Sequence, residues 1–272
     1  MKLVSVAEMR AIEKEGTRKG TSNEELMRRA GERLSGEIAE RYSAIKILPV
    51  VGLVGGGNNG GDTLIALISL QHAGWTTTAL LAKDRGHDPL IYKYVETGGK
   101  LVNAGEVKDK DGIAEVIGEA GLVLDGVLGT GLTLPLKQDI AEFLMLVKKN
   151  IVQQTVVAVD CPSGVDCDSG ETAPETLKAD LTVCFEAAKV GLLRFPAFAH
   201  CGEIVSVPIG LEDAMGSEQK LRAVIDEIWV KQRLPTRPMN AHKGTFGNVM
   251  VVGGSVNYVG APMLSGLAAY RM

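Results

Sequence analysis

Cysteine and histidine are scarce in this sequence of 272 residues, which contains four of each. No two cysteines form a C-x-x-C pair, and the histidines lack the spacing of zinc ligands. We therefore expect no zinc site and no disulfide framework, and we expect the cysteines to be reduced, packed thiols. They are Cys161, Cys167, Cys184 and Cys201.

Long apolar runs and strong net charge are also absent. No run approaches the roughly 20 residues that a membrane span requires, and the stretch from Lys2 to Glu15 is charged throughout, without a signal-peptide core. The net charge of −4 gives no electrostatic reason to expect nucleic acid. The sequence therefore predicts no membrane partner, no nucleic-acid partner and, by default, a cytoplasmic location.

Glycine, in contrast, is abundant, and it gathers between Gly55 and Asp62. An apolar run precedes this stretch and a helical pattern follows it, so we expect a strand, a glycine turn and a helix N-terminus. Glycines let the backbone approach a ligand closely, and the first N–H groups of a helix point at it. The polar side chains of Asn58, Asn59 and Asp62 predict a ligand larger than a phosphate. The alternative is a tight turn that binds nothing.

Apolar runs alternate with helical patterns along most of the chain. Two helical patterns come first, one after a capping box at Ser5 to Glu8 and a longer one over 24–42. The later alternation predicts an α/β fold, a Rossmann-like three-layer sandwich with a mostly parallel central sheet and helices on both faces. The expected strands are 47–54, 76–81, 100–102, 122–125, 155–160, 181–185 and 203–207, and the expected helices between them are 61–73, 88–97, 110–119 and 137–149.

The character of the chain changes after about residue 211. Charge rises, and residues 234–238 indicate a linker because they combine two prolines with polar residues. A new strand and glycine turn are expected over 248–254 and a new helix over 261–270, which is too little for a separate core. We therefore predict one domain over 1–230, followed over 231–272 by a linker and the incomplete start of a second domain.

Three of the expected strands end in polar, glycine-bearing loops. The first loop starts at Gly55, the second follows Asp125, and the third begins at Asp160 and continues with a Cys-Pro-Ser-Gly run. Ligands of open α/β sheets bind beyond the carboxyl ends of the strands, so a parallel sheet would bring all three loops to one edge. This coincidence is stronger evidence for a binding site than any one motif.

The aspartates that end two of these strands need different explanations. A buried Asp125 requires donors or a cation. With Asn59 and Ser163 it offers oxygen ligands carrying one full negative charge, which favours a monovalent cation such as potassium over calcium. The alternative is an aspartate that only caps N–H groups. We expect Asp160 to stabilise charge or transfer a proton, unless it only organises its turn. The loop over 129–133 is a candidate phosphate cradle, or else a flexible hairpin.

Together the three loops resemble the NAD(P)H-hydrate epimerase family of the YjeF N-terminal type. The matching runs are 58–62, 125–132 and 159–164, and residues 6–13 and 23–31 resemble the family's opening helices. The resemblance covers roughly residues 1–215, and the order and spacing of three independent motifs make it specific. Such a protein would interconvert the R and S epimers of hydrated NADH and NADPH, so that a partner dehydratase can restore the cofactor.

The resemblance implies a role for each loop. Asp160 would be the catalytic residue and would face the damaged ring, where loss and return of water through a cationic ring would exchange the epimers. Asn59, Asp125 and Ser163 would hold a potassium ion, and members of the family are commonly homodimers. The residues that would bind the hydrated dinucleotide are Asn58, Asn59, Gly60, Gly61, Asp62, Gly129, Thr130, Gly131, Leu132, Thr133, Leu134, Pro135 and Asp160.

Two positions depart from the family pattern without affecting a polar role. Thr63 stands where glycine is common, so it must fit an ordinary helical start, and Cys161 stands where an aliphatic residue is common. The tail over 240–263 resembles the start of the companion dehydratase domain, which is ribokinase-like and uses ADP or ATP. The sequence ends before that domain's Gly-Asp motif, so we expect no dehydratase activity here and a bifunctional isomerase and lyase in a longer parent.

Two other functions fit the residues less well. A non-catalytic nucleotide-binding module of the same fold is disfavoured by the intact Asp160 and by both glycine loops. An NAD-dependent oxidoreductase needs an acid at the end of the second strand, and Asp84 lies beyond it between Lys83 and Arg85. The choice between hydrated NADH and NADPH stays open, since Asp84 would disfavour a 2′-phosphate whereas its two neighbours would attract one.

Overall fold

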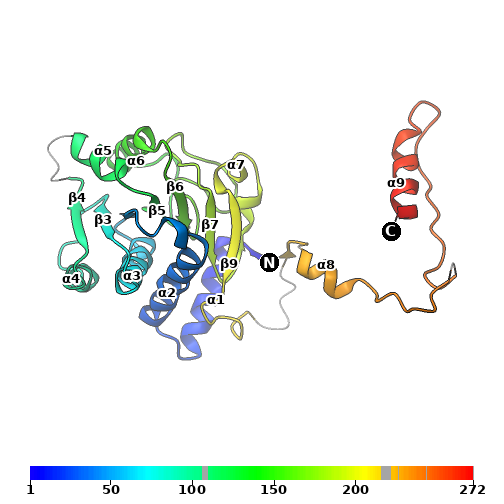
Figure 1. Ribbon diagram of the computed structural model, residues 1–272, viewed down its shortest axis with the longest axis horizontal. Helices are drawn as coiled ribbons and strands as arrows, with labels where there is room; N and C mark the ends of the chain where they lie inside the picture. The colour runs from blue at the N-terminus through cyan, green and yellow to red at the C-terminus, as the bar shows by residue number, and fades with distance from the viewer. Residues whose placement is uncertain (106–109, 216–221, 226, 243, 272) are drawn as a thin grey trace. The chain divides into compact units, whose positions relative to one another are not determined.

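The computed structural model describes residues 1–105, 110–215, 222–225, 227–242 and 244–271. They belong to two compact units, Met1–Ile225 and Asp226–Met272 (Figure 1). The first unit contains the sheet and all the predicted loops. The assignment of one domain to 1–230 and of a second to 231–272 stays a prediction.

The first unit is built on a seven-stranded sheet in which every strand is parallel to its neighbours. The strand order is β4-β3-β2-β5-β6-β7-β9, so the chain starts in the middle of the sheet and adds strands on both sides. The α/β class and all seven predicted strands are confirmed. The strands are β2 (Val50–Val54), β3 (Thr77–Leu81), β4 (Lys100–Asn103), β5 (Leu122–Gly126), β6 (Thr155–Val159), β7 (Leu181–Phe185) and β9 (Glu203–Val207).

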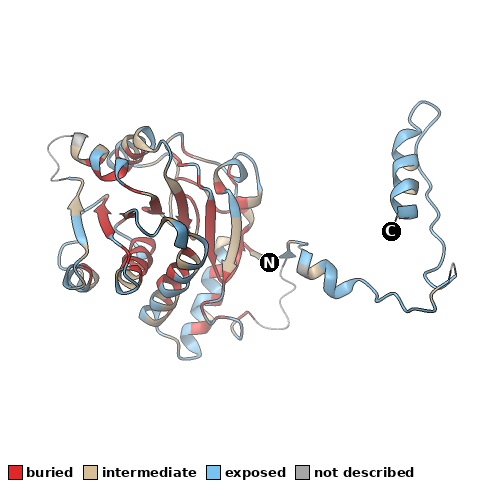
Figure 2. Cartoon of the chain, viewed as in Figure 1, coloured by how far each residue is buried: buried red, intermediate tan, exposed pale blue. Residues whose placement is uncertain are grey.

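Helices cover both faces of this sheet, and its central strands are buried (Figure 2). Side chains alternate along each strand: Val50 and Val54 pack with α1 to α4, whereas Val51 and Leu53 pack with α5 and α6. The main helices are α1 (Val6–Arg18), α2 (Asn23–Arg41), α3 (Asn58–His72), α4 (Pro89–Glu96), α5 (Lys110–Gly118) and α6 (Gln138–Asn150); shorter ones are η1 (Ser43–Ile45), η2 (Val190–Leu193) and α7 (Phe198–Cys201).

The predicted capping box begins helix α1. Ser5 Oγ accepts a hydrogen bond from the Glu8 backbone N–H at 3.1 Å, and the Glu8 carboxylate accepts one from the Ser5 N–H at 2.6 Å. The expectation that helices precede the first strand is wrong, however, because β1 (Lys2–Val4) comes first. It pairs with β8 (Ala188–Lys189) and β10 (Arg222–Ala223) in a small second sheet. A strand of three residues has no periodicity of its own and depends on distant partners.

The second unit contains helices α8 (Glu227–Arg233) and α9 (Gly260–Arg271), the second of which confirms the helix expected over 261–270. The strand expected over 248–254 is wrong, because the structure assigns no strand to these residues and Val249, Met250 and Val252 are at least 74% exposed. A strand needs a neighbour for its backbone hydrogen bonds, and the described part of this unit offers none to these residues. Across the described residues, no helix is long and apolar enough to cross a bilayer.

The four cysteines are buried and free, as predicted. They pack together in a small apolar cluster with Val165 and Leu192. Burial raises the pKa of the Cys184 thiol, which keeps it in the neutral form. These thiols therefore fill space within this cluster as small apolar groups.

Close packing of α2 on α3 generates a first prediction. A Cβ atom at Gly31 would lie 2.6 Å from Ile65 Cβ and 2.8 Å from the Asp62 carbonyl oxygen, whereas nothing lies within 4 Å of one at Gly36 on the same helix. In urea unfolding, we expect Gly31→Ala to lower the free energy of unfolding by about 1–3 kcal/mol and Gly36→Ala to raise it by about 0.5–1 kcal/mol. Equal effects at the two positions would contradict this packing.

Candidate active site

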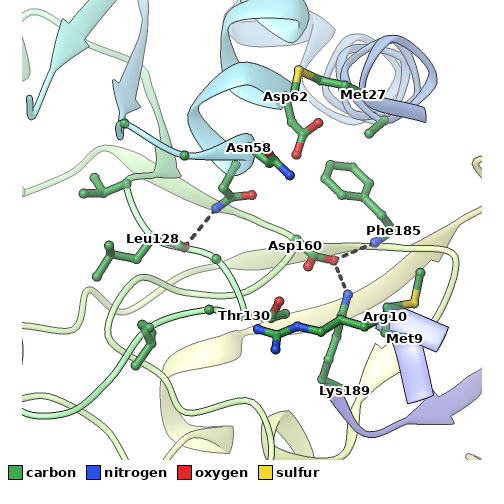
Figure 3. A pocket seen from close by; sticks show the side chains of 18 of the residues that line it. Met9, Arg10, Met27, Asn58, Asp62, Leu128, Thr130, Asp160, Phe185 and Lys189 are labelled. Carbon is green, nitrogen blue, oxygen red and sulfur yellow. Dashed lines mark hydrogen bonds and ion pairs between the residues drawn. The ribbon is translucent and has the colours of Figure 1, made fainter. Parts of the chain in front are cut away.

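A cavity of about 920 Å³ lies where β2, β5 and β6 end, and the three predicted loops all line it (Figure 3). The volume is near the upper end for small-molecule sites, as a dinucleotide requires. The predicted binding residues that line it are Asn58, Asn59, Asp62, Gly129, Thr130, Gly131, Leu132, Thr133, Pro135 and Asp160. Three others are not among its lining residues: Gly60, Gly61 and Leu134.

One wall of the cavity comes from the first two helices, which the sequence analysis did not connect with the site. Helix α1 contributes Met9, Arg10 and Glu13, and α2 contributes residues that include Met27. The guanidinium group of Arg10 lies close to the second loop, since a Cβ atom at Gly131 would lie 3.8 Å from Arg10 Nη2. This wall therefore adds the cation of Arg10 and the carboxyl group of Glu13 to the predicted site residues.

Close backbone contacts shape the glycine turn. A Cβ atom at Gly55 would lie 1.8 Å from the Val127 carbonyl oxygen, and one at Gly60 would lie 2.1 Å from the Gly55 carbonyl oxygen, so neither position tolerates a side chain. Arg85 donates hydrogen bonds to the carbonyl oxygens of Gly55 and Gly57 and forms an ion pair with Asp88. Arg85 thus holds the turn rather than lining the cavity.

Helix α3 begins at Asn58, three residues earlier than predicted. Gly57 is its N-cap, so the Asn-Asn-Gly-Gly-Asp run forms the first turns of the helix instead of a loop. Thr63 fits this helix as expected, and its hydroxyl donates a hydrogen bond to the Asn59 carbonyl oxygen at 2.8 Å. The early start places the free N–H groups of the helix beside the cavity, where they favour an anion.

Asp160 directly follows β6 and has a left-handed backbone, with φ of 64°. Its Oδ1 atom accepts a hydrogen bond from the Phe185 N–H at 3.0 Å and forms an ion pair with Lys189 Nζ. Such a backbone costs of order 1 kcal/mol or more and persists where surrounding contacts impose it. The two donors fix one oxygen of the carboxylate in place, and Asp160 lines the cavity.

Lys189 is the important site residue that the sequence analysis missed. Its side chain is 1% exposed and its only described ion pair is with Asp160. Burial alone would lower the pKa of Lys189, but the Asp160 carboxylate outweighs burial and raises it. A signal was present in the sequence, because Lys189 lies among apolar residues and a lysine is almost never fully buried unless it is paired.

Asn59, Asp125 and Ser163 come together around Leu128. The Asn59 amide donates to the Leu128 carbonyl oxygen, and the Leu128 N–H donates to Ser163 Oγ, each at 2.9 Å. Ser163 in turn donates its hydroxyl and its N–H to the two oxygens of Asp125. Asp125 is fully buried, and burial raises its pKa despite these hydrogen bonds. The structure thus groups the three predicted metal ligands, and the partners of the buried carboxylate among the described residues are neutral donors.

The buried ion pair generates a second prediction. Replacing Lys189 by methionine leaves the Asp160 carboxylate without its cation, so we expect Lys189→Met to lower the free energy of unfolding by about 3–5 kcal/mol in urea titrations at neutral pH. Arg18→Met serves as the control, because Arg18 pairs with Glu15 on the surface and its side chain is 74% exposed. A loss for Lys189→Met as small as that of the control would contradict the pairing.

Comparison with known proteins agrees with this geometry. Residues 23–191 match the model of the family described as YjeF-related protein N-terminus. The bifunctional NAD(P)H-hydrate repair enzyme Nnr of Coxiella burnetii is 32% identical over 97% of this chain and 53% of its own length. The enzyme of the same name from Hyperthermus butylicus is 34% identical over 93% of this chain and 45% of its own length. The chain thus spans about half the length of these curated relatives.

A solved structure shows the same fold. The crystal structure of yeast ynu0, YNL200c, superimposes with a TM-score of 0.64 at 20% identity and covers 76% of this chain and 88% of its own. The match to the family model includes the glycine turn, both strand-end aspartates and Lys189. The chain belongs to the family of YjeF-related protein N-terminal domains.

Proposed function

We propose that this chain is an NAD(P)H-hydrate epimerase, an isomerase that interconverts the R and S epimers of hydrated NADH and NADPH. The observation that carries the proposal is the fixed Asp160 carboxylate in a dinucleotide-sized cavity that both glycine loops line. The family and the names of the relatives support the choice of substrate. If the chain proves unable to act on this substrate, the alternative is a nucleotide-binding module of the same fold.

The cavity offers different environments to the two ends of a dinucleotide. The phosphates would lie against the N–H groups at the start of α3 and along Gly129 to Gly131, with Arg10 as a nearby cation. The damaged ring would lie against Asp160 and Phe185. This orientation places anionic groups at backbone donors and the reacting ring at a carboxylate.

The proposed chemistry uses this carboxylate for charge. When the hydroxyl group leaves the ring as water, the ring becomes cationic, and water returning to the other face gives the second epimer. Because the Phe185 N–H and Lys189 already hold Asp160, its negative charge requires no rearrangement as the positive charge develops. Lys189 acts as a positioning residue behind the carboxylate.

A potassium ion fits the cluster of Asn59, Asp125 and Ser163. All three supply oxygen atoms, the single charge is fully buried, and the Asn59 side-chain oxygen has no hydrogen bond within the described part of the chain. A bound potassium ion would supply the positive charge that the buried Asp125 otherwise lacks. The residues of the cluster would thereby fix the second loop through Leu128.

Activities of a longer parent protein also belong to this proposal. The two relatives are named as bifunctional, and the chain spans about half of their length. A nucleotide-dependent dehydratase half, using ADP or ATP, would therefore follow this domain in a longer parent. The homodimer and the cytoplasmic location stay predictions of the sequence analysis.

The first test of this proposal is the interconversion itself. Purified protein is mixed with one isolated epimer of hydrated NADH, and the appearance of the other epimer is followed by chromatography. We expect interconversion well above the spontaneous rate, and a loss of about 10²- to 10⁴-fold in Asp160→Asn. If the folded wild-type protein does not accelerate the reaction, the binding-module alternative is favoured. If Asp160→Asn is fully active, the negative charge of Asp160 is not needed for the reaction.

Potassium is tested through stability, independently of activity. A ligand that binds only the folded state raises the melting temperature. We expect a higher melting temperature in potassium chloride than in tetramethylammonium chloride at equal ionic strength, and we expect Asp125→Asn to abolish the difference. Equal melting temperatures of the wild-type protein in the two salts would contradict the potassium site.

A further inference from the structure

Asp62 is a second carboxyl group in the cavity, and its surroundings are unlike those of Asp160. It lies on α3 and lines the cavity, yet it is only 9% exposed. Its carboxyl group has no hydrogen bond and no ion pair with any residue that the structure describes. The carboxyl oxygens of Asp62 point toward the Phe185 side chain, and Asp160 lies in the same direction from Asp62 (Figure 3). A buried acid without a partner inside a ligand cavity is costly unless it is neutral or is used.

The electrostatic surroundings of Asp62 favour its neutral form. Burial raises the pKa of Asp62 well above its ordinary value, and the nearby carboxylates of Asp160 and Glu13 raise it further. The cations Lys189 and Arg85 act in the opposite direction but do not compensate, since each is already paired with another carboxylate. Of the described charged groups these four act most strongly on Asp62, and the other charged residues that line the cavity are Arg10, Lys83, Lys137 and Asp139.

Asp160 has the opposite environment in the same cavity. Its Oδ1 atom accepts a hydrogen bond from the Phe185 N–H and forms an ion pair with the buried Lys189 ammonium group. Two carboxyl groups of one site with such different environments are the usual arrangement of an acid and a charge-stabilising partner. The contrast arises from geometry, because only one of the two side chains has donors within reach.

We propose that Asp62 is the catalytic acid of this site and donates the proton to the departing hydroxyl group, while Asp160 keeps its ion pair with Lys189. The inference rests on the proposed epimerase function and deepens it. It transfers to Asp62 the proton step that the sequence analysis left with Asp160. Lys189 prevents Asp160 from taking this role, because the ion pair would be lost on protonation.

The steps balance without any further reactant. The Asp62 carboxylic acid gives its proton to the ring hydroxyl, the carbon–oxygen bond breaks with its electron pair moving to oxygen, and water leaves a cationic ring. A water molecule then forms the new carbon–oxygen bond on the opposite face and releases a proton, which returns to the Asp62 carboxylate. Substrate and enzyme both end in their original protonation state, with one epimer converted into the other.

The pH dependence follows from the need for a protonated Asp62. The acid is present below the raised pKa of Asp62 and is lost as the pH rises through that pKa, so the rate should fall on the alkaline side. We expect Asp62→Asn to lower kcat by about 10²- to 10⁴-fold, with little change in KM, and to remove this alkaline fall from the residual rate. Asp62→Glu, which keeps an acid, should recover part of the rate.

Glu13 is the competing candidate, because its carboxyl group lines the same cavity and burial raises its pKa too. We expect Glu13→Gln to keep the alkaline fall of the wild-type rate. If Glu13→Gln removes that fall instead, Glu13 is the acid and the proposal is wrong. The proposal is also wrong if Asp62→Asn loses less than about tenfold in rate. If the wild-type protein shows no epimerisation, it is the proposed function that fails.

Titration of the wild-type protein tests the protonation state without any variant. Carboxyl carbon NMR of the full chain, assigned through Asp62→Asn or by elimination if that variant does not fold, follows each aspartate separately. We expect Asp62 to titrate well above the range of an ordinary carboxyl group. An Asp62 that ionises in the ordinary range would overturn the proposal, even in an active enzyme.

Discussion

The ion pair between Asp160 and Lys189 connects the parts of the molecule that form the cavity. Asp160 directly follows β6 of the large sheet, whereas Lys189 belongs to β8 in the small one. Strand β8 pairs with β1, and β1 leads directly into α1, which brings Arg10 and Glu13 to the cavity wall. One buried contact therefore fixes the charge of the proposed site and the position of the helix that closes it.

The cavity presents two kinds of polar group. Backbone donors lie at the start of α3 and in the second loop, where the close packing of Gly55 and Gly60 leaves no room for side chains. Carboxyl groups come from Asp62, Glu13 and Asp160, and the last is paired with the buried ammonium group of Lys189. Such a set suits a substrate with anionic phosphates and a ring that becomes cationic during the reaction.

Much of this fold and part of this site could be predicted from the sequence. The seven strands and the convergence of three loops follow from local patterns, because parallel strands present their carboxyl ends at one edge. The contributions of Arg10 and Glu13 could not be predicted, since they depend on pairing between short strands far apart in the sequence. The apolar neighbours of Lys189 indicated a paired lysine, but its partner depends on the same strand pairing. The strand expected over 248–254 failed for a related reason, because an apolar run becomes a strand only beside a partner.

The sequence also could not predict how the surroundings of the two carboxyl groups in the site differ. The sequence placed both Asp62 and Asp160 in the site but could not distinguish their environments. The difference lies in one ammonium group and one backbone N–H that reach Asp160 and do not reach Asp62. Tertiary structure therefore decides which carboxyl group is paired with a cation and which has no partner among the described residues.

In the proposed reaction, this site removes water from a hydrated nicotinamide ring and returns it. The most direct measurement is to incubate the protein with one epimer in water labelled with heavy oxygen and to follow both epimers by mass spectrometry. We expect label to enter both epimers no more slowly than they interconvert, and far faster than without protein. Interconversion without incorporation of label would contradict the mechanism, and the absence of both would contradict the function.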